Sequence, residues 1–259
     1  MASLAPILET RDLTVRFGGH VAVDGVTCSF EPGTLTAIVG PNGAGKTTYF
    51  NLISGQLRAT AGAVLFKGED VTALTPDRRA RLGMGRAFQL TNLFPNLSVF
   101  ENVRLAAQAR RGGRLDLLSM ASSHRDLADK ANDYLARVSL TEKASFAAAS
   151  LSHGDQRKLE VALLIALEPD IFMFDEPTAG MSVDEAPVIL DLIEAIKSQR
   201  RKTVLLVEHK MDVVRRLADR VIVLHNGRLV ADGEPAAVVA SPIVQEAYLG
   251  VRQTGAAHV

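Results

Sequence analysis

Short apolar runs alternate with helical patterns along most of the chain. Residues 35–39, 171–174, 203–207 and 221–224 are apolar runs rich in β-branched or aromatic side chains, which is typical of buried strands. Between the second and third runs, apolar residues recur from Val188 to Ile196 at spacings of one, three and four, as on one face of a helix. Strands that alternate with helices predict an α/β fold built on a parallel sheet.

Two regions have a different pattern. Residues 8–30 alternate between apolar and polar positions, interrupted by Gly18-Gly19, and indicate an antiparallel sub-sheet. Residues 91–151 lack strand runs and are rich in Ala, Leu, Arg and Asp, which predicts a helical insertion with a loop at residues 111–114. Asn226-Gly227 predicts a two-residue hairpin, because both turn positions need a positive φ.

Composition narrows the class of protein. The chain has 259 residues, 47% hydrophobic and 22% charged, as in ordinary globular proteins. Lys+Arg and Asp+Glu both number 29, and this balance argues against a nucleic-acid partner. The only cysteine, Cys28, lies in the expected strand at residues 21–30, where we expect a small buried side chain in a reducing compartment.

No targeting or membrane segment is evident. The first twelve residues show no signal-peptide pattern, and the most apolar stretch, residues 161–167, is too short to cross a bilayer. We therefore expect a cytoplasmic chain that acts at a membrane only through a partner.

A glycine-rich segment follows the first apolar run. It reads Gly40-Pro41-Asn42-Gly43-Ala44-Gly45-Lys46-Thr47 and fits the phosphate-loop pattern G-x-x-x-x-G-K-[ST]. Glycines let the backbone turn its N–H groups toward phosphate oxygens, and the helix expected at residues 46–53 adds its positive end. We expect Lys46 to reach the β- and γ-phosphates and the Thr47 hydroxyl to bind Mg²⁺.

Two carboxylates follow the second apolar run. Asp175 comes directly after four buried strand residues, so it can hold Mg²⁺ at a fixed distance. Alternation points its neighbour Glu176 the other way, toward a water in line with the γ-phosphate.

These and four further features stand in the order of the ABC ATPase family, which the chain resembles. Residues 40–48 and 174–178 resemble its Walker A and Walker B segments, and residues 151–156 (Leu-Ser-His-Gly-Asp-Gln) resemble its signature sequence. Gln89 stands at the Q-loop position, His209 at the switch-histidine position and Phe17 where an aromatic stacks on adenine. The resemblance runs from about residue 8 to 250.

The resemblance implies a fold and a division of the chain. We expect a P-loop NTPase (ABC ATPase) core of class α/β with an N-terminal antiparallel β sub-sheet and a helical subdomain insertion. Residues 1–250 would form one ABC ATPase domain, with the helical subdomain at about 91–151 inserted in a RecA-like core, and residues 251–259 a tail.

The resemblance also implies the site residues, with ATP and Mg²⁺ as ligands. Catalytic roles fall to Glu176, which activates water, His209 and Lys46, which hold the γ-phosphate, and Gln89, which senses Mg²⁺. Nucleotide binding falls to Phe17, Val23, Gly40, Asn42, Gly43, Ala44, Gly45, Lys46, Thr47 and Thr48, joined by Ser152 and Gly154, and metal binding falls to Thr47, Gln89 and Asp175.

Ser152 and Gly154 are expected to contact the nucleotide of a second ATPase subunit, at the start of a helix over residues 155–167. The signature departs from the commonest spelling: His153 stands where glycine is usual and Asp155 where glutamine is usual. A carboxylate is favoured by the helix dipole but unfavourable near a γ-phosphate, and the sequence leaves open which effect dominates. Ser182 stands where many members carry aspartate.

Local spellings resemble one subfamily more closely. Residues 86–95, 175–181 and 247–250 are similar to the Liv-type ATPases of branched-chain amino-acid uptake, while ATPases for urea or amide uptake and for lipopolysaccharide export share some of them. The expected partners are transmembrane permease subunits, a second ATPase subunit (identical or different) and, indirectly, a periplasmic binding protein, with the chain peripheral on the cytoplasmic face of the inner membrane.

Three other classes of protein fit the sequence less well. A soluble ABC-type ATPase of DNA repair or translation usually carries coiled-coil arms, two ATPase halves or a basic surface. A GTPase would show an Asn-Lys-x-Asp guanine reader, a kinase would need a phosphate acceptor, and a non-catalytic sensor would not need Glu176 and His209.

Overall fold

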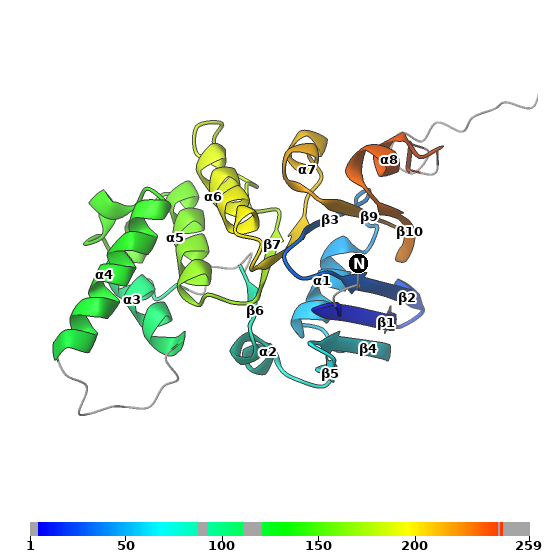
Figure 1. Ribbon diagram of the computed structural model, residues 1–259, viewed down its shortest axis with the longest axis horizontal. Coiled ribbons are helices and arrows are strands. Elements are labelled where there is room, and N and C mark those ends of the chain that lie inside the picture. Colours follow the sequence, from blue (N-terminus) through cyan, green and yellow to red (C-terminus); the bar gives the residue numbers. More distant parts are fainter. Residues whose placement is uncertain (1–4, 88–92, 111–120, 243, 246–259) are drawn as a thin grey trace, which may run out of the picture. The chain divides into compact units, whose positions relative to one another are not determined.

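The computed structural model describes residues 5–87, 93–110, 121–242 and 244–245. The chain forms two compact parts, named here the first part (residues 1–76 and 203–259) and the second part (residues 77–202). Figure 1 labels the helices and strands of both.

An antiparallel sheet opens the first part, as the alternating pattern predicted. Its strands run in the order β2-β1-β4-β5, with bounds β1 Leu8–Phe17, β2 His20–Phe30, β4 Ala61–Phe66 and β5 Glu69–Asp70. Gly18-Gly19 form the turn between β1 and β2. Cys28 is buried in β2, and desolvation raises the pKa of its thiol to about 11.

A second set of strands in the first part is centred on β3 (Leu35–Val39). It pairs in parallel with β8 (Thr203–Val207) and β9 (Arg220–His225), and β10 (Arg228–Gly233) lies antiparallel to β9. All five residues of β3 are buried, as expected for a strand covered on both faces. The predicted hairpin is confirmed, because Asn226 and Gly227 take φ values of 48° and 76°.

Three helices complete the first part: α1 (Lys46–Ser54), α7 (Met211–Leu217) and α8 (Pro235–Ala240). Val214 of α7 and Val238 of α8 share a buried cluster with the β-branched residues of β3 and β9. This packing holds the carboxyl ends of β3 and β8 at one edge, where the glycine-rich segment and His209 follow them.

The second part combines a short parallel strand pair with helices. Strand β6 (Met84–Arg86) pairs with β7 (Ile171–Asp175), so that Arg86 lies opposite Met173. The helices are α2 Pro76–Leu82, α3 Val99–Arg110, α4 Ala121–Arg137, α5 His153–Ala166 and α6 Ala186–Ser198, with 3-10 turns η1 Thr141–Lys143 and η2 Ala148–Ser150. Helices α3, α4 and α5 pack on one another and lie side by side in Figure 1.

Most predicted elements agree with the structure. The helix expected from apolar spacing is α6, which buries Ile189, Leu192, Ile193 and Ile196. The signature helix was predicted to begin at residue 155, but α5 begins at His153, because the Ser152 side chain caps it. The loop at residues 111–114 and the tail at residues 251–259 lie outside the described residues, and the boundaries of the helical subdomain stay a prediction.

None of the described helices has both the length and the apolar composition that a membrane crossing requires.

Candidate nucleotide-binding and hydrolysis site

The glycine-rich segment forms a tight loop between β3 and α1. A Cβ atom added to Gly40 would lie 2.2 Å from the carbonyl oxygen of Leu224, and one added to Gly45 would lie 2.5 Å from that of Ala22. Gly45 also takes a φ of 95° as the N-terminal cap of α1. The neighbouring backbone therefore leaves no room for a side chain at either position.

Lys46 lies over this loop. Its ammonium donates to the carbonyl oxygens of Gly40 at 2.7 Å and Pro41 at 3.0 Å, and the residue is almost fully buried. Ala44 is buried too, and its carbonyl accepts from the N–H of Gly227 in the β9–β10 turn at 3.0 Å. The loop is thus braced from outside and holds one cation at its centre.

The remaining loop residues face outward. Asn42, Gly43 and Thr47 are exposed and Thr48 is partly exposed. Because Gly45 offers no side chain to cap α1, no side-chain cap occupies the start of the helix. A helix start of this kind suits an anion bound through backbone N–H groups.

His209 follows β8 at the edge from which the loop springs. The N–H of Glu208 donates to the carbonyl of Ile38 in β3 at 3.3 Å, so the two strand ends are joined. The carboxylate of Glu208 is buried and accepts from the backbone N–H groups of His209 at 2.7 Å and Lys210 at 3.2 Å. Glu208 therefore fixes the backbone that presents the half-exposed imidazole of His209.

Phe17 and Val23, both predicted to bind the nucleotide, differ in exposure. Phe17, at the end of β1, is half exposed and can offer a ring face. Val23 is fully buried in β2, and its role in nucleotide binding stays a prediction. The alternation of β2 turns Val23 into the core, while the backbone of Ala22 lies against Gly45.

Asp175 ends β7 in the second part, as predicted. Its carboxylate Oδ2 lies 3.1 Å from Nη2 of Arg86, and both side chains are buried, with 0% and 6% exposed. Burial lowers the pKa of Arg86, and the charge of Asp175 opposes this effect. The buried ion pair was not foreseen, since it joins residues 89 positions apart in the chain.

Glu176 leaves strand geometry. Its φ is 47°, in the left-handed region that side chains rarely adopt, and its carbonyl accepts from the N–H of Ala179 in the turn that follows. The sequence analysis predicted the direction of the Glu176 side chain from strand alternation. In the structure this direction is set by the turn. Backbone strain of this kind is concentrated at functional positions.

The start of α5 carries a network of charges around Asp155. The carboxylate accepts from the Ser152 hydroxyl at 3.0 Å and pairs with Lys143 through Oδ2 and with Lys158 through Oδ1 at 3.3 Å. Burial would raise the pKa of Asp155, but the hydrogen bonds from Lys143, Ser152 and Lys158 together hold it below its ordinary value. The negative charge of Asp155 is therefore balanced by neighbouring cations. The sequence alone did not reveal this balance.

Gly154 is backed by a second carboxylate. A Cβ on Gly154 would lie 2.3 Å from Oε1 of Glu185, whose Oε2 accepts from the hydroxyl of Ser182 at 3.0 Å. Ser182, which stands where many ABC ATPases carry aspartate, is thus held within its own segment.

Two of the residues predicted to bind Mg²⁺ carry oxygen donors, one in each part of the chain. Asp175 supplies a carboxylate at a rigid strand end and Thr47 an exposed hydroxyl, which are the ligand types that Mg²⁺ prefers. Within the described ranges, no group of three or more His, Cys, Asp and Glu side chains is placed to hold a metal alone. Gln89 lies outside the described residues.

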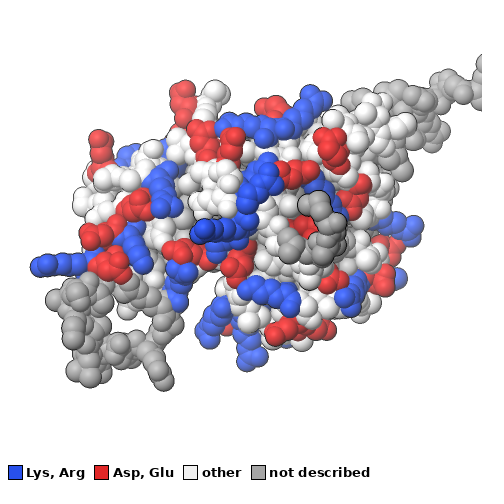
Figure 2. Space-filling model, viewed as in Figure 1, with Lys and Arg blue, Asp and Glu red and all other residues white. Residues whose placement is uncertain are grey.

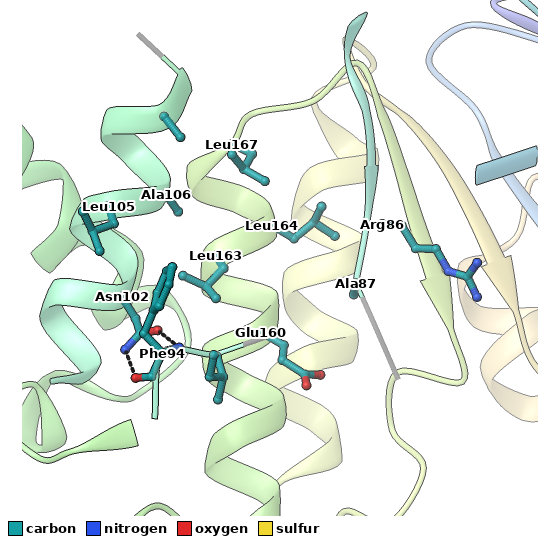
Figure 3. Close-up of a pocket in the computed structure, with 12 residues that line it drawn as sticks. Arg86, Ala87, Phe94, Asn102, Leu105, Ala106, Glu160, Leu163, Leu164 and Leu167 are labelled. Carbon is teal, nitrogen blue, oxygen red and sulfur yellow. Dashed lines mark hydrogen bonds between the residues drawn. The ribbon is translucent and has the colours of Figure 1, made fainter. Parts of the chain in front are cut away.

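A groove of about 380 Å³ opens in the second part (Figure 3). Its walls come from α3, α5 and the end of β6 and are mainly apolar; they include Phe94, Leu105, Leu163, Leu164 and Leu167. Glu160 is the acidic residue of the lining. It is 7% exposed, none of the described residues hydrogen-bonds to its Oε1, and burial raises its pKa despite the nearby Arg157.

The surface charges are mixed. On the face drawn in Figure 2, acidic and basic side chains are interspersed and no large area carries one sign.

A phosphate loop with a buried lysine, a carboxylate pair after a parallel strand and a capped signature helix together define an ABC-type ATPase. Comparison with known proteins gives the same class. A family model described as ABC transporter matches residues 23–179, and one described as branched-chain amino acid ATP-binding cassette transporter matches residues 228–253.

Individual relatives agree. The high-affinity branched-chain amino acid transport ATP-binding protein BraF of Pseudomonas aeruginosa is 39% identical over 95% of this chain and 98% of its own. The solved ADP conformation of an ATP-binding cassette of an ABC transporter superposes with a TM-score of 0.79 at 29% identity, covering 96% of this chain and all of that one. A dimeric post-hydrolysis cassette bound to ADP and Pi superposes with a TM-score of 0.77 at 25% identity, covering 88% and 98%.

The chain therefore belongs to the ABC transporter ATP-binding proteins of the branched-chain amino acid type. It has the ABC ATPase fold and is an ATP hydrolase coupled to transport. These findings confirm the family, fold and enzyme class that the sequence predicted.

Proposed function

We propose that the chain hydrolyses ATP to drive the uptake of branched-chain or related amino acids through a membrane transporter. The observation that carries the proposal is the phosphate loop, in which neighbouring backbone leaves no room for a side chain at Gly40 and Gly45 and the buried Lys46 donates to the carbonyl of Gly40. The similarity to BraF over nearly the whole chain supports the class of transported molecule.

Each predicted residue takes a role in hydrolysis. The loop amides and Lys46 bind the phosphates, and Lys46 balances the charge that develops on the γ-phosphoryl group. Glu176 accepts a proton from the attacking water, and His209, fixed by Glu208, donates to the γ-phosphate. Thr47, Asp175 and Gln89 are the proposed ligands of Mg²⁺, which when bound neutralises phosphate charge.

The signature helix serves a second ATPase subunit, identical or different. Ser152 and Gly154 bind the γ-phosphate held by the loop of that subunit, so that ATP closes the pair and ADP does not. The exposed position of Ser152 at the start of α5, and the existence of a dimeric relative, support this assignment.

The groove beside Glu160 takes an apolar segment of a transmembrane permease subunit. The groove is open and largely apolar, and its wall holds a carboxylate with one oxygen that has no hydrogen-bond partner among the described residues, which favours a segment that brings a donor to that point. A periplasmic binding protein contributes indirectly, by delivering the amino acid to the permease.

Placement and domain organisation follow from these partners. The chain lies peripherally on the cytoplasmic face of the inner membrane. We propose residues 1–250 as one ABC ATPase domain with residues 91–151 as its inserted helical subdomain, which α3 and α4 populate.

The test is a transport assay with the permease and binding-protein chains that co-purify with this subunit, in lipid vesicles. We expect ATP hydrolysis that rises when leucine is supplied with the binding protein. Hydrolysis that responds to urea or an amide, and not to leucine, would show that the assigned substrate class is wrong.

Two variants test the roles of the residues. Glu176→Gln should keep ATP binding, lower turnover by about 10²–10⁴-fold and trap the ATP-bound dimer, because the base is lost. Lys46→Ala should weaken nucleotide binding itself. Glu194→Gln, which changes an exposed carboxylate on α6, is the control. Normal turnover in Glu176→Gln, or unchanged ATP affinity in Lys46→Ala, would contradict the assignment.

A further inference from the structure

The hydroxyl of Ser152 is engaged twice within its own helix. Its oxygen accepts from the N–H of Asp155 at 3.2 Å, and its proton goes to Oδ2 of the Asp155 carboxylate at 3.0 Å. Phosphate oxygens bearing negative charge accept hydrogen bonds and do not donate them. Ser152 can therefore bind a terminal phosphate only by turning its single proton away from Asp155.

The same carboxylate would also repel a phosphate. Asp155 is buried in the first turn of α5, one residue from Gly154, and two like charges at short range in a partly desolvated site interact strongly. Without compensation, Asp155 would thus oppose the proposed ligand twice, by holding the proton of Ser152 and by its charge.

Two lysines balance the charge of Asp155, and they bind different oxygens of its carboxylate. Lys158 lies within α5 and divides its ammonium between Oδ1 of Asp155, at 3.3 Å, and Oε1 of Glu185, at 3.8 Å. Lys143 comes from outside α5, in the turn η1, and its ammonium binds Oδ2, the oxygen that also accepts from Ser152. Lys143 is therefore the cation able to replace Ser152 as the donor to that oxygen.

We propose that Lys143 is a positioning residue that frees the hydroxyl of Ser152 for the terminal phosphate of ATP held by the second subunit. It acts through Asp155, by satisfying Oδ2 when Ser152 turns away and by neutralising the carboxylate. The inference rests on the proposed dimer and concerns a step that the phosphate loop does not share.

The experiment measures ATP-dependent dimerisation of the full chain in the Glu176→Gln background by sedimentation. Lys143→Ala should weaken the dimer about tenfold, because a charged hydrogen bond to Oδ2 is lost. Lys143→Arg should restore it, since arginine keeps the cation. The affinity of the isolated chain for ADP should stay the same in all variants, because the loop at residues 40–47 is untouched.

Lys130→Ala is the matched control. Lys130 has a similar side-chain exposure (46% against 43% for Lys143) and also pairs with an aspartate, Asp126 at 3.8 Å, but lies on α4. It should leave dimerisation unchanged. Lys143→Gln, which keeps half of the aliphatic stem, provides a second neutral variant, and thermal unfolding checks that each protein is folded.

The decisive comparison uses Asp155→Asn. Once Asp155 is neutral, Lys143 has no charge to compensate, so Lys143→Ala should cause no further loss in that background. A loss that persists with Asp155→Asn, that arginine does not rescue, or that is absent in both neutral variants overturns the inference and leaves the proposed function intact. If the Glu176→Gln parent forms no dimer with ATP, either alone or with the second ATPase subunit that co-purifies with it, the proposed ATP-closed dimer fails, and the inference with it.

Discussion

Two helices of this chain begin with a residue expected to face phosphate, and they begin in opposite ways. The N-cap residue of α1 is Gly45, so this helix has no side-chain cap, and its first turn holds no acidic residue. The N-cap residue of α5 is Ser152, whose side chain caps the helix, and its first turn holds Asp155. The first start is built from backbone alone, whereas the second is already occupied by side chains.

The difference indicates how each start can bind an anion. The start of α1 carries no side-chain cap, so no side chain has to leave its N–H groups, and only the ammonium of Lys46 has to turn from the loop carbonyls of Gly40 and Pro41. The start of α5 binds an anion only if its own hydroxyl turns and its own carboxylate is neutralised. Nucleotide binding should therefore be intrinsic to one chain, while closure of the dimer should be sensitive to the charges around Asp155.

The largest expected effect comes from a methyl group at the start of α1. Gly45→Ala places Cβ against the backbone oxygen of Ala22 in a residue with a φ of 95°, and neither can relax cheaply. We expect nucleotide affinity to fall by at least about tenfold and the chain to be less stable by about 1–3 kcal/mol. Fluorescent ATP binding and chemical denaturation measure the two; normal affinity would show that the loop does not need this glycine.

The same methyl group at the start of α5 should have a smaller and different effect. Gly154→Ala meets only the flexible carboxylate of Glu185, within a helix where alanine is well tolerated. We expect ADP binding by the isolated chain to stay normal and ATP-dependent dimerisation to weaken several-fold. Loss of ADP binding in this variant would show that the two starts are not independent.

The smallest expected effect is a pH-dependent difference in stability between the wild type and Asp155→Asn. Since the pKa of Asp155 is held below its ordinary value in the folded chain, its contribution to stability is present above about pH 4. That contribution is lost as the pH falls through the lowered pKa. Wild type and Asp155→Asn should therefore differ in free energy of unfolding near pH 6 and converge once the pH has fallen through the lowered pKa. Urea denaturation across this range checks it, and a gap that widens in acid would mean that the sign is wrong.

The start of α1 could be predicted from the sequence because glycine spacing carries its geometry directly. The hairpin at Asn226-Gly227 was predictable for the same reason, since both positions need a positive φ. The start of α5 was placed two residues late, although Ser152 followed three positions later by Asp155 is itself a capping pattern.

Contacts between distant segments could not be predicted in this way. Nothing in the spacing of Lys143 and Asp155, or of Arg86 and Asp175, shows that they meet, because those contacts depend on how helices and strands pack. Glu208 had one available signal, its position beside His209 directly after a buried strand. The burial of Val23 follows from the alternation of β2, which turns this residue inward.

Strand β6 is only three residues long, and its last residue, Arg86, contacts both the groove and Asp175. Arg86 borders the groove, and its guanidinium is directed away from α3 and α5 (Figure 3). The same guanidinium binds Asp175. One side chain therefore links the wall of the groove to the acid at the end of β7, so a displacement of that wall is transmitted to the acid without passing through a longer chain of contacts.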